Sequence, residues 1–422
     1  MNNSILLDIF TLNNADHIWA QLAPLSESDW EALIAQARLH KIISLLWQRL
    51  KLLGLSERLP AIARQSILTQ LKDIGTCNLA NYLELMKLLA ELEKQGIGVI
   101  LLKGLHLTQT AYRDLALRPM IDMDILVRKE HLAPVQAILL DWGYVPTEEQ
   151  SVEMTCALGA HHLPCLTKVG NPYTHIEIHW HIEVASAPFA IDLDGLWQRS
   201  QWWQLGAFKV GGLSPEDLLL HLSIHAAYHH LFDVGLIVFF DVAKTIEYYE
   251  TVLDWDSLQK RAVAWGAIRP LFLTLYLARE LAGANVPEAS LTSLVPDDPH
   301  KWVELAKQQL MAKSNLKHEQ LTIDTLASVI NTTRKWESWA ELLHFLRQML
   351  FPNRQRLKPL CPWFKHSFLV YLCLPLIWLR YLKQYGWPLL QWIFSRKKRQ
   401  QVNTQLQQLE PSVELHRWFI DD

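Results

Sequence analysis

The sequence lacks the short motifs that mark the commonest nucleotide-binding and hydrolytic folds. It has no GxxxxGK(S/T) loop, no GxGxxG fingerprint, no GxSxG nucleophile elbow and no HExxH pair. P-loop, dinucleotide-binding and hydrolase functions therefore have no local support.

Cysteine is scarce as well. The five cysteines are widely spaced and form no CxxC pair, so we predict neither a disulfide framework nor a thiolate zinc site. The first residues lack a basic segment and a cleavage signature, so we expect no secretory signal. Together these absences favour a cytoplasmic protein.

The sequence has no large excess of positive or negative charge. Lys and Arg number 40 against 43 Asp and Glu. That balance excludes a broadly cationic protein and gives no strong nucleic-acid signal. Half of the 422 residues are hydrophobic and 20% are charged, so the chain can bury large cores, and its length predicts two or three domains.

The alternation of helical and strand-like segments predicts four regions. They are a helical N-terminal region, a mixed α/β core, a helical domain and an apolar helical tail with a basic run, at residues 1–84, 85–210, 211–350 and 351–422. The predicted fold class is therefore α+β, with a small mixed sheet flanked by helical regions.

Local signals in individual segments support this division into four regions. Ser28, followed three residues later by Glu31, predicts a capping box that opens a helix. Ser214 before Pro215 predicts the N-cap of another. Three runs with β-branched or alternating residues predict strands, at residues 97–104, 118–127 and 175–184.

The C-terminal tract allows two interpretations. Its apolar segments, interrupted by Arg380 and Lys383, are too short for a confident transmembrane helix. They either pack on the helical domain or form an amphipathic helix that, with the basic residues 396–399, docks on an anionic membrane surface.

Asp122 and Asp124 form the most informative pattern. Residues i and i+2 of a strand point to the same face, so both carboxylates project from one side. A divalent cation such as Mg²⁺ relieves their repulsion. In the alternating strand 175–184, Glu177 and His179 share a face, so Glu177 can join the pair. The alternative to a metal site is that these residues are ordinary polar positions on the exposed faces of strands.

The turn Lys103-Gly104 precedes that strand. Glycine lets the backbone approach a ligand, and a following helix offers free N–H groups to a phosphate. Lys103 adds a point charge for phosphate.

This combination resembles the uncharacterised nucleotidyltransferase family of the DNA polymerase β-type superfold. The resemblance rests on the strand–Lys-Gly–helix segment, on RPMIDMDILV at residues 118–127 and on EIHW from Glu177, and covers about residues 85–250. It implies Asp122, Asp124 and Glu177 as catalytic, metal-holding residues for Mg²⁺ or Mn²⁺. It also implies phosphate binding by Lys103, Gly104 and Arg118.

The sequence departs from the superfold at two points. Leu105 follows the turn where a serine or glycine is usual, so a hydroxyl contact to phosphate is missing. The gap between Gly104 and Asp122 is also longer than in the commonest members.

Histidines recur every fourth residue at 221, 225 and 229. Three interpretations remain open for this helix: a zinc site, half-buried histidines bonded to neighbours, or a cleft wall with His225 and His229 facing the carboxylates. Asp241 either orients a histidine or caps the next helix. His179 is expected beside Glu177 or the acceptor.

The resemblance implies transfer of a nucleoside monophosphate from an NTP, with ATP the expected donor, to an unknown acceptor hydroxyl. A non-catalytic nucleotide-binding or scaffold protein that keeps the fold is the alternative, motivated by Leu105. A third is an accessory protein in peripheral membrane contact through its C-terminal tail.

Overall fold

The computed structural model describes residues 2–148, 150–168, 174–312, 411 and 413–420. Nearly all of them belong to one compact unit, formed by residues 1–314 and 415–422. The apolar tract around residues 366–394 and the basic run 396–399 lie outside the described residues, so both predictions for that tail stay predictions. No helix in the described part combines the length and apolar character needed to cross a bilayer.

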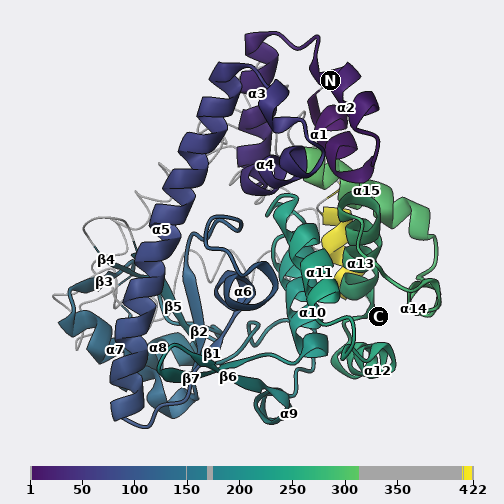
Figure 1. The fold of residues 1–422 in the computed structure, drawn as a ribbon. Helices are drawn as coiled ribbons and strands as arrows, with labels where there is room; N and C mark the ends of the chain where they lie inside the picture. Colours follow the sequence, from purple (N-terminus) through teal and green to yellow (C-terminus); the bar gives the residue numbers. More distant parts are fainter. Residues whose placement is uncertain (1, 149, 169–173, 313–410, 412, 421–422) are drawn as a thin grey trace, which may run out of the picture. The chain divides into compact units, whose positions relative to one another are not determined.

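Helices dominate the described unit (Figure 1). The first part of the chain forms α1 (Asn2–Thr11), α2 (Ala15–Leu22), α3 (Glu27–Leu39), α4 (Ile43–Leu52), η1 (Ser56–Arg58) and α5 (Ala61–Lys94). The middle forms β1 (Ile100–Leu101), α6 (Lys103–Leu107), η2 (Thr108–Tyr112), β2 (Met123–Leu126), η3 (Lys129–His131), α7 (Leu132–Asp141), β3 (Tyr144–Pro146), α8 (Val152–Ala157), β4 (Leu166–Lys168), β5 (Thr174–His179), α9 (Leu193–Arg199), β6 (Gln201–Leu205) and β7 (Phe208–Gly212). The last part forms α10 (Pro215–Ile224), η4 (His225–His229), α11 (Ile237–Tyr248), α12 (Trp255–Trp265), α13 (Ile268–Ala282), α14 (Glu288–Thr292) and α15 (Pro299–Ala312).

The strands form one mixed sheet, which confirms the predicted α+β class. The order is β3-β4-β5-β2-β1-β7-β6. Strand β2 pairs in parallel with β5, β1 pairs in parallel with β7, and the other neighbours are antiparallel. The sequence predicted three of these strands. It missed β3, β4, β6 and β7 because three to five residues are too few to reveal a period of two.

One detail of the predicted helices is corrected. The capping box of α3 is made by Ser26 and Asp29, with Ser28 inside the helix. Helix α5 runs unbroken through the predicted boundary at residue 84, and β6 and β7 bring residues up to 212 into the sheet. The prediction of Ser214 as N-cap with Pro215 at the first helical position is confirmed.

One face of the sheet packs on α5 and α7. Met123 and Ile125 of β2 and Ile176 and Ile178 of β5 are buried there, in one hydrophobic core with leucines of both helices. The alternation of β2 and β5 therefore sends Asp124 and Glu177 to the opposite face. That alternation ends with β5 at His179, so the predicted continuation to residue 184 is wrong.

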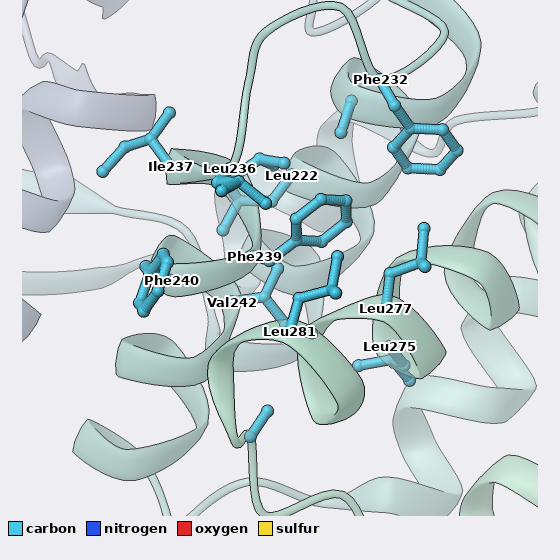
Figure 2. Close-up of a cluster of buried hydrophobic side chains, with 14 of the residues drawn as sticks. Leu222, Phe232, Leu236, Ile237, Phe239, Phe240, Val242, Leu275, Leu277 and Leu281 are labelled. Carbon is cyan, nitrogen blue, oxygen red and sulfur yellow. The ribbon is translucent and has the colours of Figure 1, made fainter. Parts of the chain in front are cut away.

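A second core joins distant parts of the chain. It unites α1–α4 with α10–α13, α15 and the C-terminal residues Leu415, Trp418 and Phe419. Figure 2 shows its centre, where Phe232 from the loop before α11 lies near Phe239 of that helix, with ring centroids 5.8 Å apart. The N-terminal helices, the first turns of α5 and the helical domain thus share one core.

His106 of α6 is a buried histidine that gives this unit a pH-dependent stability. Its side chain is fully buried, and burial lowers its pKa to about 4. Because the folded pKa lies below the unfolded value, its contribution is complete above about pH 6.5 and is lost as pH falls toward 4.

We expect His106→Gln to reduce the loss of unfolding free energy at acid pH. Between pH 7.5 and pH 5.0 the wild type should lose about 2 kcal/mol more unfolding free energy than the variant. Urea unfolding at both pH values measures this, and other titrating groups cancel in the difference. Equal losses in the two proteins would contradict a neutral, buried His106.

Candidate functional site

The parallel pairing of β2 and β5 is the basis of the candidate site. In this register Asp124 lies directly beside Glu177, and Leu126 beside His179. Parallel neighbours present their side chains to the same face. The two carboxylates, 53 positions apart in the chain, therefore stand side by side on the face away from α5 and α7.

Asp124, Glu177 and His179 form a compact group that has metal-ligand character. One donor atom of each lies within 4.8 Å of the others. The Nε2 atom of His179 is 2.9 Å from Oδ1 of Asp124 and 3.4 Å from Oε2 of Glu177. Two carboxylates and an imidazole are suitable donors for a divalent cation. In the described part of the chain, no other group meets this closeness.

Electrostatics in this group favour the charged forms. Burial alone would raise the pKa of Asp124, but Lys103 and the hydrogen bond from His179 hold it well below its usual range. Burial would lower the pKa of His179, yet its bonds to Asp124 and Glu177 raise it. Burial likewise opposes ionisation of Glu177, but the hydrogen bond from His179 together with the charges of His162 and His179 outweighs it, and the Glu177 pKa is lowered.

Asp122 has a different environment from its predicted partner. It precedes β2, is only half-buried and lines the cavity wall outside the compact group. Burial and the neighbouring Asp124 raise the pKa of Asp122. His179 thus takes the place in the group that the sequence pattern predicted for Asp122.

Lys103 sits at the strand-to-helix turn in a conformation unusual for its residue type. Its φ is 42°, in the left-handed region that favours glycine. Its Nζ is 2.9 Å from Oδ1 of Asp124. Burial would lower the pKa of Lys103, but Asp124, Glu177 and Asp122 outweigh burial and raise it. A strained residue therefore carries a cation into the acidic group.

Gly104 provides room for Arg118. A Cβ at residue 104 would overlap the guanidinium of Arg118. Arg118 in turn donates to Asp241 from Nε and from Nη2, the latter at 2.8 Å. Tyr112 donates to the same carboxylate at 2.8 Å. This network fixes α11 to the segment before β2.

Asp241 therefore has neither role that the sequence suggested. It lies inside α11 rather than at a cap, and its carboxylate pairs with Arg118 and Tyr112 rather than with a histidine. Burial would lower the pKa of Arg118, but the attraction of Asp241 is stronger and raises that pKa above its usual value. Asp241 and Arg118 both line the cavity.

A cavity of about 330 Å³ opens over these groups. Its walls come from the turn at Lys103, the β2–β5 face, the histidine segment, α11 and the α3–α4 connection. Its charged and histidine lining residues are Lys41, Lys103, Arg118, Asp122, Asp124, His161, His162, Glu177, His225, His229, His230 and Asp241. Every predicted site residue except His179 lines it, and His179 lies behind its carboxylate partners.

The histidine segment faces this cavity from across the carboxylates. Helix α10 changes to a π-helical turn at His225, which widens the spiral between His225 and His229. These two rings stack with centroids 5.8 Å apart. The Nδ1 atom of His229 also lies 3.3 Å from Oε1 of the buried Glu183. His221 does not line the cavity, and the three repeating histidines form no metal-ligand group within the described chain.

His161 and His162 also line the cavity, although no pattern in the sequence predicted them. His162 pairs by a β-bridge with His179, and its Nε2 is 4.0 Å from Glu177. Burial first, and then the neighbouring His179, lower the pKa of His161 to about 2 and also lower that of His162. The His-His dipeptide was the only local signal, because it lies in a segment without periodicity.

Comparison with known proteins identifies a family for most of the described chain. Residues 26–283 match the family described as uncharacterised nucleotidyltransferase. The match begins at the N-cap of α3 and ends at the C-cap of α13, so it includes helices on both sides of the sheet. No curated protein and no solved structure matches the chain significantly. The matched region is more than half of the sequence, and the chain therefore belongs to the uncharacterised nucleotidyltransferase family.

Proposed function

We propose that this chain transfers a nucleoside monophosphate from a nucleoside triphosphate to an acceptor hydroxyl. One observation carries the proposal: β2 and β5 present Asp124, Glu177 and His179 as a compact donor group at a cavity of about 330 Å³. Family membership supports the same reaction class. ATP is the expected donor, and the cysteine pattern favours the cytoplasm as its location.

The donor set fits a divalent cation. Asp124 and Glu177 supply oxygen, and His179 supplies nitrogen once a cation displaces the proton of its Nε2. The ammonium of Lys103, 2.9 Å from Asp124, already balances one negative charge of this group. Mg²⁺ or Mn²⁺ bound there supplies positive charge for phosphate oxygens. Asp122, on the cavity wall, is proposed as a further carboxylate for the cation or its waters.

The proposed reaction forms a bond from the acceptor oxygen to the α-phosphorus. The bond from that phosphorus to the β-phosphate oxygen breaks, and pyrophosphate leaves with the electron pair. Glu177, ionised and 19% exposed at its side chain, accepts the proton of the acceptor hydroxyl. Its exposure to the cavity is what lets a hydroxyl reach it.

Phosphate binding in this proposal is the role of the turn at Lys103 and of Arg118. Lys103 lies beside Asp124 and can donate to phosphate with its remaining protons. Arg118 uses Nε and Nη2 for Asp241 and Nη1 for the carbonyl of Pro119, so we propose that its other N–H groups meet the phosphates. Gly104 keeps this space open for the guanidinium.

A non-catalytic nucleotide-binding protein is the second candidate. Leu105, at the position where the superfold usually has a hydroxyl or glycine, is buried in the sheet core and offers no phosphate contact. In that case the cavity binds a nucleotide without transferring it.

The carboxylate variant Asp124→Asn tests the first candidate. We expect pyrophosphate release from the preferred NTP to fall more than about 100-fold, because even an outer-shell partner of a metal ligand is worth about 10- to 100-fold. Release is measured for each of the four NTPs with Mg²⁺ or Mn²⁺ and a mixture of candidate acceptors.

Two further variants separate chemistry from folding. Asp124→Asn leaves Lys103 without its ion pair, so Glu177→Gln is run beside it, and the exposed Asp16→Asn is the matched control. Nucleotide and metal binding by a silent wild type would favour the binding protein. Silence without either kind of binding would rule out the carboxylate hypothesis.

The imidazole in the donor set predicts a preference among metals. Nitrogen ligands suit transition metals better than Mg²⁺, so we expect Mn²⁺ to bind more tightly than Mg²⁺. His179→Asn should weaken Mn²⁺ by at least about tenfold and change Mg²⁺ less. Titration of the Mn²⁺ paramagnetic resonance signal measures this, with His225→Asn as the control on the same cavity. Equal losses for both metals in His179→Asn would count against a nitrogen ligand.

A further inference from the structure

Carboxylates outnumber lysines and arginines in the cavity lining before a nucleotide arrives. Lys103 pairs with Asp124, and Arg118 pairs with Asp241. Asp122 and Glu177 add two more acidic groups to the lining. A triphosphate brings several negative charges into this space, so the cationic side chains of the lining are candidates to receive it, together with a bound divalent cation.

Lys41 brings such a cation from the N-terminal helices. It lies in the connection between α3 and α4 and lines the same cavity as Asp124 and Glu177. The side chain is half-buried. Its ε-ammonium on a flexible four-carbon stem is a suitable point charge for phosphate oxygens.

The backbone at Lys41 has a conformation in which glycine is the usual residue. The N–H of Ile42 donates to the carbonyl of Ala37, and the N–H of Lys41 donates to that of Arg38. These two bonds form a Schellman motif with Lys41 at its left-handed position, where φ is 58°. Glycine would adopt this φ without strain, so the helix end alone does not explain a lysine here.

The position of Lys41 is held by the loop before α11. Gly235 in that loop has φ of 90°, and a Cβ there would come within 2.9 Å of the Cα of His40. The N–H of Ile237 donates to the carbonyl of His40 at 3.2 Å. Behind this contact, Phe232, Leu236 and Ile237 anchor the loop in the core (Figure 2). The connection is therefore fixed against the cavity wall.

We infer that Lys41 is a phosphate-binding residue, and that it forms with Lys103 a subsite for the polyphosphate chain of the nucleotide. This inference rests on the proposed function, because it names the subsite that the leaving pyrophosphate would occupy. The N-terminal helical region thereby contributes directly to substrate binding, and the strain at Lys41 is retained for its charge.

Three substitutions of Lys41 separate charge from strain. Lys41→Met removes the charge and keeps the strain, Lys41→Gly removes both, and Lys41→Arg keeps both. The matched control for strain is Asp298→Gly, because Asp298 also has a left-handed φ, of 50°, and lies outside the cavity. The control for charge is Lys51→Met, an exposed lysine of α4 that is not in the lining.

The probe is inorganic triphosphate with Mn²⁺, titrated by calorimetry at fixed ionic strength. We expect Lys41→Met and Lys41→Gly to bind it about tenfold more weakly than wild type, and Lys41→Arg within about threefold. The two controls should bind as wild type does. Mn²⁺ alone should bind all variants equally, since Lys41 is not in the donor group. Lys41→Gly should also raise the melting temperature by about 2 °C, as should Asp298→Gly.

Each other outcome decides between this inference and the proposed function. Equal triphosphate affinity in wild type and Lys41→Met would overturn the inference and leave the proposed function standing. A lower melting temperature in Lys41→Gly, with unchanged triphosphate affinity, would assign Lys41 a structural role instead. A wild type that binds Mn²⁺ but no triphosphate would refute the nucleotide part of the proposed function, and the subsite with it.

Discussion

The burial of Asp124 is the constraint on which the candidate site depends. The residue is 1% exposed, and an isolated carboxylate at such a depth would be protonated or would destabilise the fold. It is kept ionised by Lys103 from one side and His179 from the other. Those partners come from the turn after β1 and from the end of β5. A single buried charge on β2 therefore fixes the positions of the ends of β1 and β5 relative to it.

A second buried pair extends this arrangement to the helical half. Arg118, from the segment before β2, is held by Asp241 in the middle of α11, and Tyr112 shares the same carboxylate. Removing one partner of a buried pair leaves the other uncompensated, which is costly. The sheet and the helical domain are thus connected by charge as well as by packing. The cavity between them depends on both.

Unusual backbone is concentrated at the same place. Lys41, Lys103, Leu231 and Phe232 have positive φ without being glycine, and the π-helical turn His225–His229 lies beside them. Strain of this kind persists where packing and hydrogen bonds over-determine the conformation. Here the loop before α11 is anchored by the buried Phe232 and Leu236, and it in turn supports the connection at His40. The walls of the cavity are therefore held in place by the hydrophobic core.

The sequence by itself determined the local features of this protein. Alternation in β2 and β5 predicted which face carries Asp124 and Glu177, and Ser214 with Pro215 predicted the start of α10, because these signals depend on periods of two and on caps within a few residues. Only the tertiary structure decided the rest. The parallel register put His179 rather than Asp122 into the donor group, and the pairing of Arg118 with Asp241 spans 123 positions. His161 and His162 reach the cavity from a segment without periodicity, and Lys41 reaches it from the end of a helix far away in the chain. Contacts of such separation leave no local pattern, since they arise only when the cores of the sheet and of the helices have formed together.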